Sequence, residues 1–386
     1  MRPLGRLSEK GALALVSLTS FAVFLSANML KPVLPVLASD LGGGELEVSG
    51  VMMAALVLLS LAQPLTGALS DRYGRVRMLV VGGALGALSS LACAAASSWS
   101  HLLALRGLSG LADAISGPAM LAIVASVSAE SRGLAFGVFR LSQGTSFVLG
   151  PLVGAAVAEL WGLRAPFVVD FALTITAVAA FAATFGHEAS RGVRSACPLG
   201  AARAVLSSPK MLRAACLGFL ETSSFAIWLS FLPARMVSLG LGEAEVALVI
   251  SAEALAFSAS SVVVGYASDK VGRRPVALLG SLVAGASSAL YLAVSDVVHL
   301  ALASAAYGAG CSAMYLMSTV AAADLAPEEA RGAVLGSFDA IVDLGLAAGP
   351  LANWALLRAT GLPSSASFTV MVLLSALAAV ASAGLN

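Results

Sequence analysis

Long apolar segments alternate with short polar turns along the whole chain. Charge clusters, glycines and prolines separate these segments, and each is close to the roughly 20 apolar residues with which a helix crosses a bilayer. Twelve segments result, over residues 11–37, 47–69, 78–97, 101–128, 133–157, 164–185, 212–238, 245–267, 275–294, 299–324, 332–357 and 364–384. The long apolar runs, with few β-branched alternations, favour helices over a β-barrel. The pattern therefore predicts an all-α integral membrane protein with twelve transmembrane helices.

The composition supports this prediction and excludes several other classes of protein. Of the 386 residues, 59% are apolar and 11% are charged, whereas a soluble domain carries about 25% charged residues. A net charge of +1 argues against nucleic-acid binding, which needs a basic surface. The four cysteines show no metal-ligand or redox spacing, so we expect no disulfide and no metal site. The sequence has no nucleotide-binding loop or catalytic set, and we expect no enzymatic activity.

Basic residues are unevenly distributed between the two sets of loops. With twelve spans both termini lie on one side, and 16 arginines and lysines fall there against four on the other side. The majority are Arg2, Arg6, Lys10, Arg72, Arg75, Arg77, Arg132, Arg191, Arg194, Arg203, Lys210, Arg213, Lys270, Arg273, Arg274 and Arg331. Because cytoplasmic loops carry an excess of Lys and Arg, we expect both termini in the cytoplasm and the protein in the cell membrane.

One polar turn occurs twice in the chain. Residues 67–75 return at 265–273, 198 positions later, with the same glycines, aspartate and final arginine. Further matches at shifts of 198 or 199 pair Pro35, Gly42, Arg132, Gly133, Gly137, Gly150 and Pro151 with Pro233, Gly240, Arg331, Gly332, Gly336, Gly349 and Pro350. We therefore expect two pseudo-symmetric six-helix bundles, 1–186 and 212–386, joined by a cytoplasmic linker at 187–211. Such parallel repeats are an architecture of transporters.

The repeated turn resembles the signature loop of the major facilitator superfamily, and the resemblance covers nearly the whole chain. The pattern is G-x-x-x-D-R-x-G-R, and Val76 departs from it because a second basic residue is usual there. The resemblance implies a major facilitator fold that works by alternating access, in which this loop latches the two halves on the cytoplasmic side. The latch residues it implies are Gly67, Asp71, Arg72, Gly74, Arg75, Asp269 and Arg273. The simpler alternative is that these are topology determinants and solvated loop charges.

Eight charged residues are the candidates for charges at membrane depth: Arg106, Asp113, Arg140, Asp170, Glu221, Glu253, Asp339 and Asp343. A charge at the bilayer centre costs about 2.5–3.5 kcal/mol on insertion scales, so each needs a partner, water or a proton. Arg106 and Asp113 are seven residues apart, on one face of the fourth span. Arg106 also opens a segment that resembles the R-x-x-x-G segment of proton-coupled members of the superfamily. We expect this pair to couple proton movement, with a fixed salt bridge as the alternative.

Asp339 and Asp343 are second candidates for proton coupling, since two acids four residues apart repel when both are ionised. Arg140 and Asp339 occupy equivalent positions in the repeat and could form an ion pair, with Asp113 as an alternative partner for the arginine. Asp170 follows Arg164 near the outer end of its span, where we expect a structural role.

The remaining polar residues at membrane depth are candidates for the substrate cavity. Asn28, Arg140, Glu221 and Glu253 form this set. Either glutamate could bind a cationic substrate or titrate. Either could also be a group that makes a hydrogen bond between helices.

The fifth span contains a helix-bend motif, Gly150-Pro151 followed by Gly154. Proline bends a helix and glycine lets a neighbouring helix approach closely. The motif resembles the G-P-x-x-G-G segment of the exporter branch, the drug/proton antiporters, from which Ala155 departs. Ordinary packing of small residues is the alternative, because the Gly-Pro pair recurs at Gly349-Pro350.

These observations lead to one functional prediction and two alternatives. We expect a secondary active transporter that exports small lipophilic or cationic molecules, with a proton gradient as the energy source and no cofactor. The partners expected are a small-molecule substrate and the lipid bilayer, with no nucleic acid, and the chain is expected to act as a monomer. The first alternative is a proton-coupled symporter for a sugar, an organic anion or another nutrient. The second is a membrane sensor or scaffold on the same fold.

Overall fold

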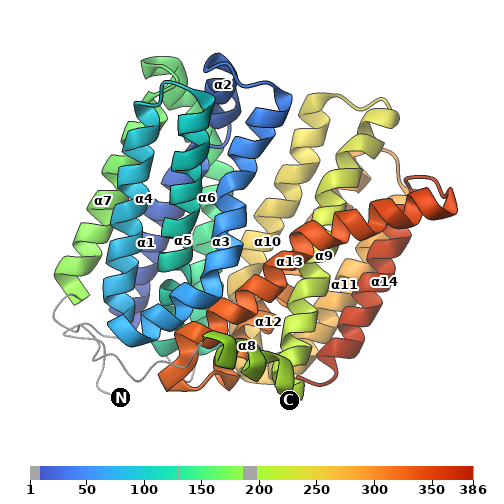
Figure 1. Ribbon diagram of the computed structural model, residues 1–386. Helices are drawn as coiled ribbons and strands as arrows, with labels where there is room; N and C mark the ends of the chain where they lie inside the picture. The colour runs from blue at the N-terminus through green and yellow to red at the C-terminus, as the bar shows by residue number, and fades with distance from the viewer. Residues whose placement is uncertain (1–8, 128–130, 186–197, 386) are drawn as a thin grey trace. The chain divides into compact units, whose positions relative to one another are not determined.

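The computed structural model describes residues 9–127, 131–185 and 198–385, and every regular element in these ranges is helical (Figure 1). The helices are α1 Glu9–Met29, α2 Val33–Asp40, α3 Glu45–Tyr73, α4 Arg75–Ala94, α5 Trp99–Val127, α6 Arg132–Trp161, α7 Ala165–Phe185, α8 Pro198–Ser207, α9 Pro209–Ser238, α10 Glu243–Val271, α11 Arg273–Ala293, α12 Val297–Leu325, the short 3-10 helix η2 Glu328–Ala330, α13 Arg331–Thr360 and α14 Ala366–Ser382. Four of the basic residues used for orientation, Arg2, Arg6, Arg191 and Arg194, and linker residues 187–197 lie outside the described ranges.

The described part of the chain contains 11 candidate membrane spans that are long and apolar enough to cross a bilayer. They follow the predicted segments closely, and the first, Leu13–Asp40, includes both α1 and α2. The last predicted segment, 364–384, corresponds to α14, which has 17 residues and is shorter than the roughly 20 that a span needs. The protein is therefore a multi-pass membrane protein, and the number twelve and the side on which the termini lie stay predictions.

The chain divides into two compact units. Unit 1 comprises Met1–Ser128, Thr145–Arg203 and Ala326–Ala340, and unit 2 comprises Ala129–Gly144, Ala204–Leu325 and Ile341–Asn386. Residues 132–144 of α6 thus belong to unit 2, and residues 331–340 of α13 belong to unit 1. At these two helices the units do not follow the chain order of the predicted bundles. The arrangement as two six-helix bundles stays a prediction.

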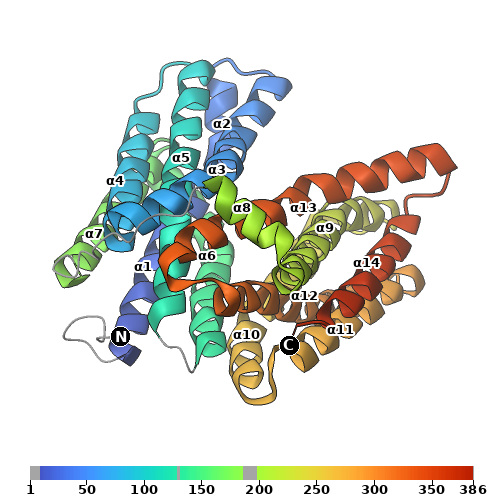
Figure 2. The same ribbon diagram turned by 60° about the horizontal axis from the view of Figure 1, so that its bottom comes forward.

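The helices of each unit pack in the same order. In unit 1, α5 packs against α3 and α4, and α7 packs against α4 and α1. In unit 2, α12 packs against α10 and α11, and α14 packs against α11 and α9. Figure 1 and Figure 2 show α4 beside both α5 and α7 in two orientations. The sequence repeat therefore reappears as a repeated packing pattern.

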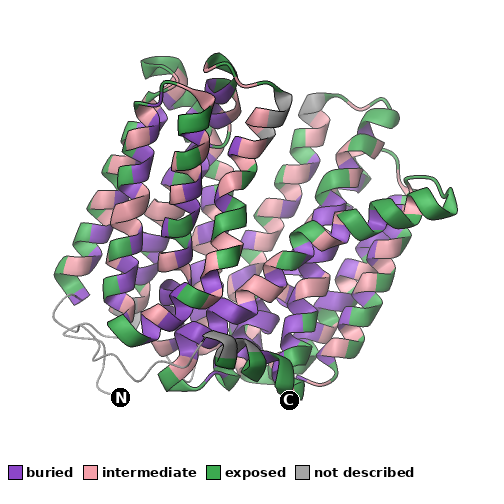
Figure 3. Cartoon of the chain, in the orientation of Figure 1, coloured by how far each residue is buried: buried purple, intermediate pink, exposed green. Residues whose placement is uncertain are grey.

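Burial varies around each helix in the way that a lipid-exposed surface requires. Large apolar side chains such as Leu61, Val263 and Val380 are exposed, and exposed positions recur along the length of the described helices (Figure 3). In water such a surface would be unfavourable, whereas hydrocarbon accepts it. The central helix of unit 2, α12, is the opposite case, because most of its second half is buried.

Candidate functional site

Each copy of the repeated turn is a tight junction between two helices. In the first copy α3 ends at Tyr73 and α4 begins at Arg75, and the intervening Gly74 has a φ of 99°. In the second copy Gly272 has a φ of 91° between α10 and α11. Side chains disfavour this left-handed region, which glycine enters without cost. The final glycine of the motif is therefore required by the turn itself.

In unit 1 the aspartate of the motif binds the start of a distant helix. Asp71 accepts hydrogen bonds from the backbone N–H groups of Gly332 at 2.9 Å and Ala333 at 2.8 Å, at the first turn of α13. Both carboxylate oxygens are used, and the Asp71 side chain is 1% exposed. The first N–H groups of a helix have no partner within it and carry partial positive charge. Asp71 therefore joins the first half of the sequence to a helix of the second half.

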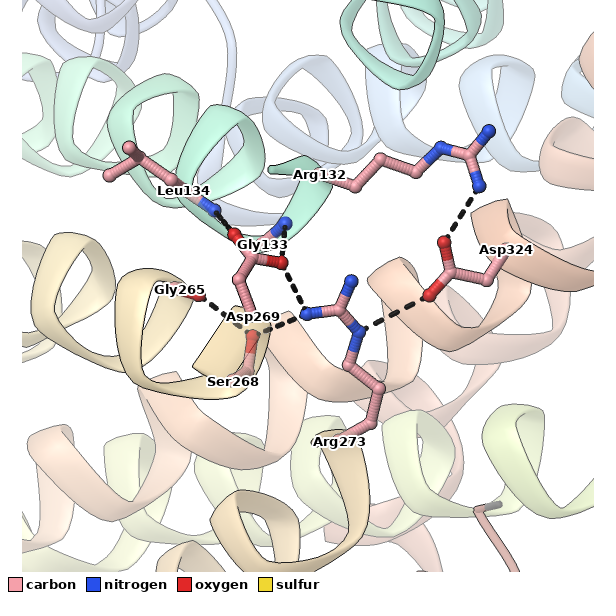
Figure 4. A network of polar contacts seen from close by, with 8 residues as sticks. All are labelled: Arg132, Gly133, Leu134, Gly265, Ser268, Asp269, Arg273 and Asp324. Atoms are coloured by element: carbon pink, nitrogen blue, oxygen red, sulfur yellow. Dashed lines mark hydrogen bonds and ion pairs between the residues drawn. The ribbon is translucent and has the colours of Figure 1, made fainter. Parts of the chain in front are cut away.

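In unit 2 the second copy makes the reciprocal contact. Asp269 accepts hydrogen bonds from the N–H groups of Gly133 at 3.0 Å and Leu134 at 2.8 Å, at the first turn of α6 (Figure 4). Arg273, one turn after the aspartate, donates to Asp269 at 2.6 Å and to Ser268 at 2.8 Å. The second half of the sequence thus holds a helix of the first half. We call the two arrangements the Asp71 network and the Asp269 network.

The first glycine of the motif permits both networks to form. A Cβ added to Gly67 would meet the backbone of Gly332, and one added to Gly332 would meet the backbone of Gly67. Gly265 and Gly133 restrict each other in the same way in unit 2. Glycines at helix contacts let two backbones approach closely. The motif therefore supplies two parts of one contact, a glycine that brings the helix start near and an aspartate that binds it.

The two networks differ in one acidic residue. Asp324 of α12 accepts from Arg132 at 2.8 Å and from Arg273 at 3.2 Å, so it bridges α6 and α11 in unit 2 (Figure 4). In unit 1, 198 positions earlier in the sequence, Ser126 stands at this place. Its hydroxyl accepts from Arg75 at 2.8 Å and from Arg331 at 3.4 Å. The Asp269 network therefore contains a bridging carboxylate where the Asp71 network has a hydroxyl.

Arginines of the motif divide into two kinds. Arg75 lies 3.7 Å from Asp71 and donates to the carbonyl of Glu328 at 2.8 Å, so it belongs to the network. Arg72 is exposed and lies 5.4 Å from the ring of Tyr73. Of the seven proposed latch residues, Asp71, Arg75, Asp269 and Arg273 thus form bonds in the two networks, Gly67 permits the close approach, and Gly74 forms the turn. Arg72 is exposed beside Tyr73.

Three charged residues interact in unit 1. Arg106 on α5 interacts electrostatically with Asp113 on the same helix and with Asp170 on α7. Asp113 is exposed, Arg106 is half-buried, and Asp170 is buried. Thr174 donates to Asp170 at 3.2 Å and shares a hydrogen bond of 2.9 Å with Ser26. Asp170, for which the sequence predicted an interfacial role, thus belongs to the same charged set as the predicted coupling pair.

The predicted cavity residues occupy different surroundings. Asn28 is buried in unit 1, where it donates to the Phe24 carbonyl at 2.7 Å and to Ser146 at 3.3 Å. Arg140 in unit 2 donates to Gln143 at 2.6 Å and lies 4.5 Å from the ring of Tyr315. Asn28 is therefore held within the packing of α1 and α6, whereas Arg140 is half-buried beside an aromatic ring.

Four predicted acids occur in two pairs. Glu221 of α9 and Glu253 of α10 are buried in unit 2 and interact electrostatically. Asp339 and Asp343 are both half-buried on α13, and the boundary between the units falls between them.

The helix-bend motif brings α6 against α1 in unit 1. Pro151 lies inside α6. A Cβ added to Gly150 would meet Asn28, and one added to Gly154 would meet the backbone of Met29. The motif therefore serves close packing here, as the second Gly-Pro pair does at Gly349, which packs against the backbone of Ser223.

Comparison with known families identifies the protein class. A sequence model described as Major Facilitator Superfamily matches residues 16–236 and again residues 214–385. The chain belongs to the Major Facilitator Superfamily. Both halves match, in agreement with the repeat. This is a family of transporters and not of enzymes, and the resemblance of the chain to this superfamily is confirmed.

Individual relatives agree with this assignment. The chain is 29% identical over 182 residues to the methyl viologen resistance protein SmvA of Salmonella typhimurium, covering 46% of this chain and 37% of the relative. It is 31% identical over 161 residues to the quinolone resistance protein NorA of Staphylococcus aureus, covering 41% of this chain and 40% of the relative. The chain thus spans well under half the length of these curated relatives in each match. The solved structure of the human organic anion transporter MFSD10 superposes with a TM-score of 0.82 at 19% identity over 98% of this chain and all of the other, which shows a shared fold.

Within this Major Facilitator Superfamily protein, the sequence reasoning missed two participants. Asp324 was not singled out, and Arg132 was used only to support the repeat and to predict orientation. A signal for Asp324 exists, because it pairs with Ser126 in the repeat and the change from serine to aspartate adds a charge. The partners that a carboxylate receives depend on tertiary packing, so the repeat alone does not show that this charge is shared by two arginines.

Proposed function

We propose that this chain is a secondary active transporter of the cell membrane that exports small lipophilic or cationic molecules in exchange for protons. The observation that carries the proposal is the excess of acids among the charged candidates at membrane depth. Six of the eight candidates are acids and two are arginines. Acids at this depth bind protons or cations, whereas an anion carrier needs unpaired basic residues. The names of SmvA and NorA support an exporter of toxic compounds, and methyl viologen is a permanent cation.

In this proposal the transporter works by alternating access, with both termini in the cytoplasm. The two networks lie at the predicted cytoplasmic ends of the helices and act as the latch. Each network binds the first turn of a helix from the other half of the sequence, so both must break for those helix starts to move. The bonds between carboxylate and backbone are short and charge-assisted. They supply a defined closed state that can be released as a unit.

Proton coupling in this proposal uses the charged set of unit 1. Arg106 interacts with two acids, and it cannot neutralise both. Asp170 is buried and receives a hydrogen bond from Thr174, so it is a resident partner for the arginine. Asp113 is less buried than Asp170, and in this proposal it is the acid that takes up and releases the coupling proton. A shift of Arg106 toward either acid changes whether Asp113 is stabilised as an anion.

Transport into proteoliposomes tests this function. Purified protein is reconstituted, the membrane potential is set to zero with potassium and valinomycin, and a pH gradient is imposed. Radiolabelled methyl viologen is the first probe because its charge does not change with pH, and a quinolone, a sugar and an organic anion follow. For one-for-one exchange, a gradient of about one pH unit supports about tenfold accumulation. An antiporter accumulates the probe in the acidic compartment, and a proton symporter accumulates it in the alkaline compartment.

Two variants identify the coupling residue. We expect Asp113→Asn to abolish accumulation driven by the pH gradient, because the amide carries no exchangeable acid proton. Asp40→Asn is the matched control, since Asp40 is exposed at the end of α2. Accumulation in the alkaline compartment would overturn the export proposal. A sodium gradient that drives transport equally well without a pH gradient would overturn proton coupling.

A further inference from the structure

Two acids of unit 2 are buried without an ion pair. Glu221 is 3% exposed and Glu253 is 4% exposed. The ion pairs formed among the described residues include neither of them. The Oε1 atom of Glu253 is buried and has no hydrogen-bond partner among the described residues. A buried carboxylate that is ionised without a positively charged partner is costly.

Packing does not explain why a glutamate stands at position 253. A Cβ added to Gly308 on α12 would meet the backbone of Glu253, so the two helices touch through main chain at this point. In unit 1, Gly110 meets the backbone of Ala55 in the same way, and each residue precedes its counterpart by 198 positions. The contact thus forms equally well around an alanine. The carboxyl group of Glu253 is an addition that the helix contact does not need.

The acid and the arginine linked to the Glu253 site by electrostatic interactions do not supply a dedicated cation. Glu221 on α9 is an acid and interacts electrostatically with Glu253. Arg140 on α6 interacts electrostatically with Glu221, and it lies 4.5 Å from the ring of Tyr315 and donates to Gln143. Arg140 is therefore engaged with other groups, and among the described residues it forms no ion pair with Glu253.

The titratable groups on α12 and α11 already have partners. Cys311 forms a hydrogen bond with Glu221. The Tyr307 hydroxyl shares a hydrogen bond of 2.8 Å with Ser224. The Tyr291 hydroxyl accepts from Trp228 at 2.9 Å and shares a hydrogen bond of 2.9 Å with Ser304. The hydrogen bonds of these neighbours are made with other residues, and none of them is made with Oε1 of Glu253.

We propose that Glu253 is a proton-binding site that carries a coupling proton, with Glu221 as the neighbouring acid that makes ionisation of both unfavourable. The inference rests on the proposed proton-coupled function and adds a second site to it, in unit 2. In the step proposed, the carboxylate of Glu253 takes a proton from a hydronium ion, so that an O–H bond of hydronium breaks, a water molecule is left and an O–H bond forms on Glu253. On the other side of the membrane this O–H bond breaks, and the proton passes to water and forms hydronium again.

Infrared difference spectroscopy tests proton binding without any substrate. Reconstituted protein is titrated from acid to alkaline pH, and the carbonyl band of the protonated carboxylic acid is followed. We expect a titrating band in the wild type that is lost in Glu253→Gln. Glu245→Gln is the matched control, because Glu245 lies on the same helix, is half-buried and binds only the N–H of Gly242 at 2.8 Å. Identical difference spectra for wild type and Glu253→Gln would overturn the proposal.

The second arm measures coupling in the proteoliposome assay with methyl viologen. We expect Glu253→Gln to lower the accumulation ratio from about tenfold per pH unit to one, while exchange of labelled for unlabelled probe continues at zero gradient. A purely structural role for Glu253 predicts that the accumulation driven by the pH gradient and the exchange at zero gradient fall together. Glu253→Ala, which copies Ala55, is the second variant if the glutamine does not fold. If the wild type shows the titrating band of Glu253 but transports none of the probes, the proton-binding site stands and the proposed transport function is overturned. If Glu253→Gln transports with unaltered coupling, the proposed function stands and the role of Glu253 is overturned.

Discussion

Replacing Asp71 by asparagine tests whether the Asp71 network holds a conformational state. The change keeps the size of the side chain and one carbonyl oxygen, and it removes the charge. Asp71 uses both of its oxygens, for Gly332 and for Ala333. The amide nitrogen of asparagine must therefore face one of the two N–H donors. One bond is lost and a buried donor is left without an acceptor.

The magnitude follows from the number and type of bonds lost. A hydrogen bond to a charged group contributes about 1.5–3 kcal/mol, and a negative charge at a helix start contributes about 0.3–1 kcal/mol, up to about 2 when partly buried. The carboxylate here is almost fully buried, so we expect a loss of about 2–4 kcal/mol. Since about 1.4 kcal/mol is a factor of ten, the equilibrium between latched and released states should shift by about 30-fold to several hundredfold.

Single-molecule fluorescence energy transfer measures this shift. Dyes are attached to cysteines that replace Arg77 and Arg274, two exposed residues at the starts of α4 and α11, in a background without native cysteines. The control is Asp296→Asn, because Asp296 accepts from the N–H of His299 only three residues away and therefore joins no distant segments. We expect Asp71→Asn to populate the released state and to lower the transport rate. A folded Asp71→Asn protein with wild-type populations and transport would refute the latch.

Three further outcomes follow from the same contacts. Gly265→Ala should destabilise the Asp269 network, because the added methyl group meets the backbone of Gly133. Gly117→Ala on α5 should leave thermal stability unchanged, because nothing lies within 4 Å of its new methyl group. The melting temperatures of the two variants test this difference. Asp324→Ser gives unit 2 the hydroxyl found in unit 1. It should shift the equilibrium between latched and released states less than Asp71→Asn does, because the side chain of Asp324 is 33% exposed and exposed ion pairs contribute about 0.2–1 kcal/mol. A shift equal to or larger than that of Asp71→Asn would contradict this prediction. A hydrogen bond from His299 lowers the pKa of Asp296. The stabilisation from this acid should therefore be complete above its ordinary pKa and disappear as the pH falls through the lowered pKa. Melting temperatures of the wild type and Asp296→Asn across acid pH test whether the stabilisation is lost in this direction.

The predicted elements agree closely with the described helices, and the physical reason is local. Each span needs an unbroken apolar run and satisfies its backbone internally, so the chain's own pattern of polar turns marks where the helices begin and end. One difference is instructive. The last predicted segment begins with Ser364 and Ser365, before α14 begins at Ala366, and these two serines form a turn instead of extending the helix.

Candidate residues were predictable where the repeat or a motif marked them. Asp71 and Asp269 followed from the duplicated turn. Asp170 illustrates the opposite case. Its place near the end of a span suggested an interfacial role, yet α7 packs against α4 and α1, and the acid lies buried and within electrostatic range of Arg106. Spacing along one helix does not show what another helix brings opposite.

The sequence by itself determined the membrane setting, the helical segments, the internal repeat and the paired aspartates, because hydrophobic pattern and duplication are properties of the chain read in order. Only the tertiary structure decided which helix start each aspartate binds. Asp71 and Gly332 are 261 positions apart, and α6 and α13 each divide between the two compact units. Asp324 shared by two arginines and Glu253 left without a partner also emerge only in three dimensions. Partners are chosen by packing between distant segments, which no local pattern records.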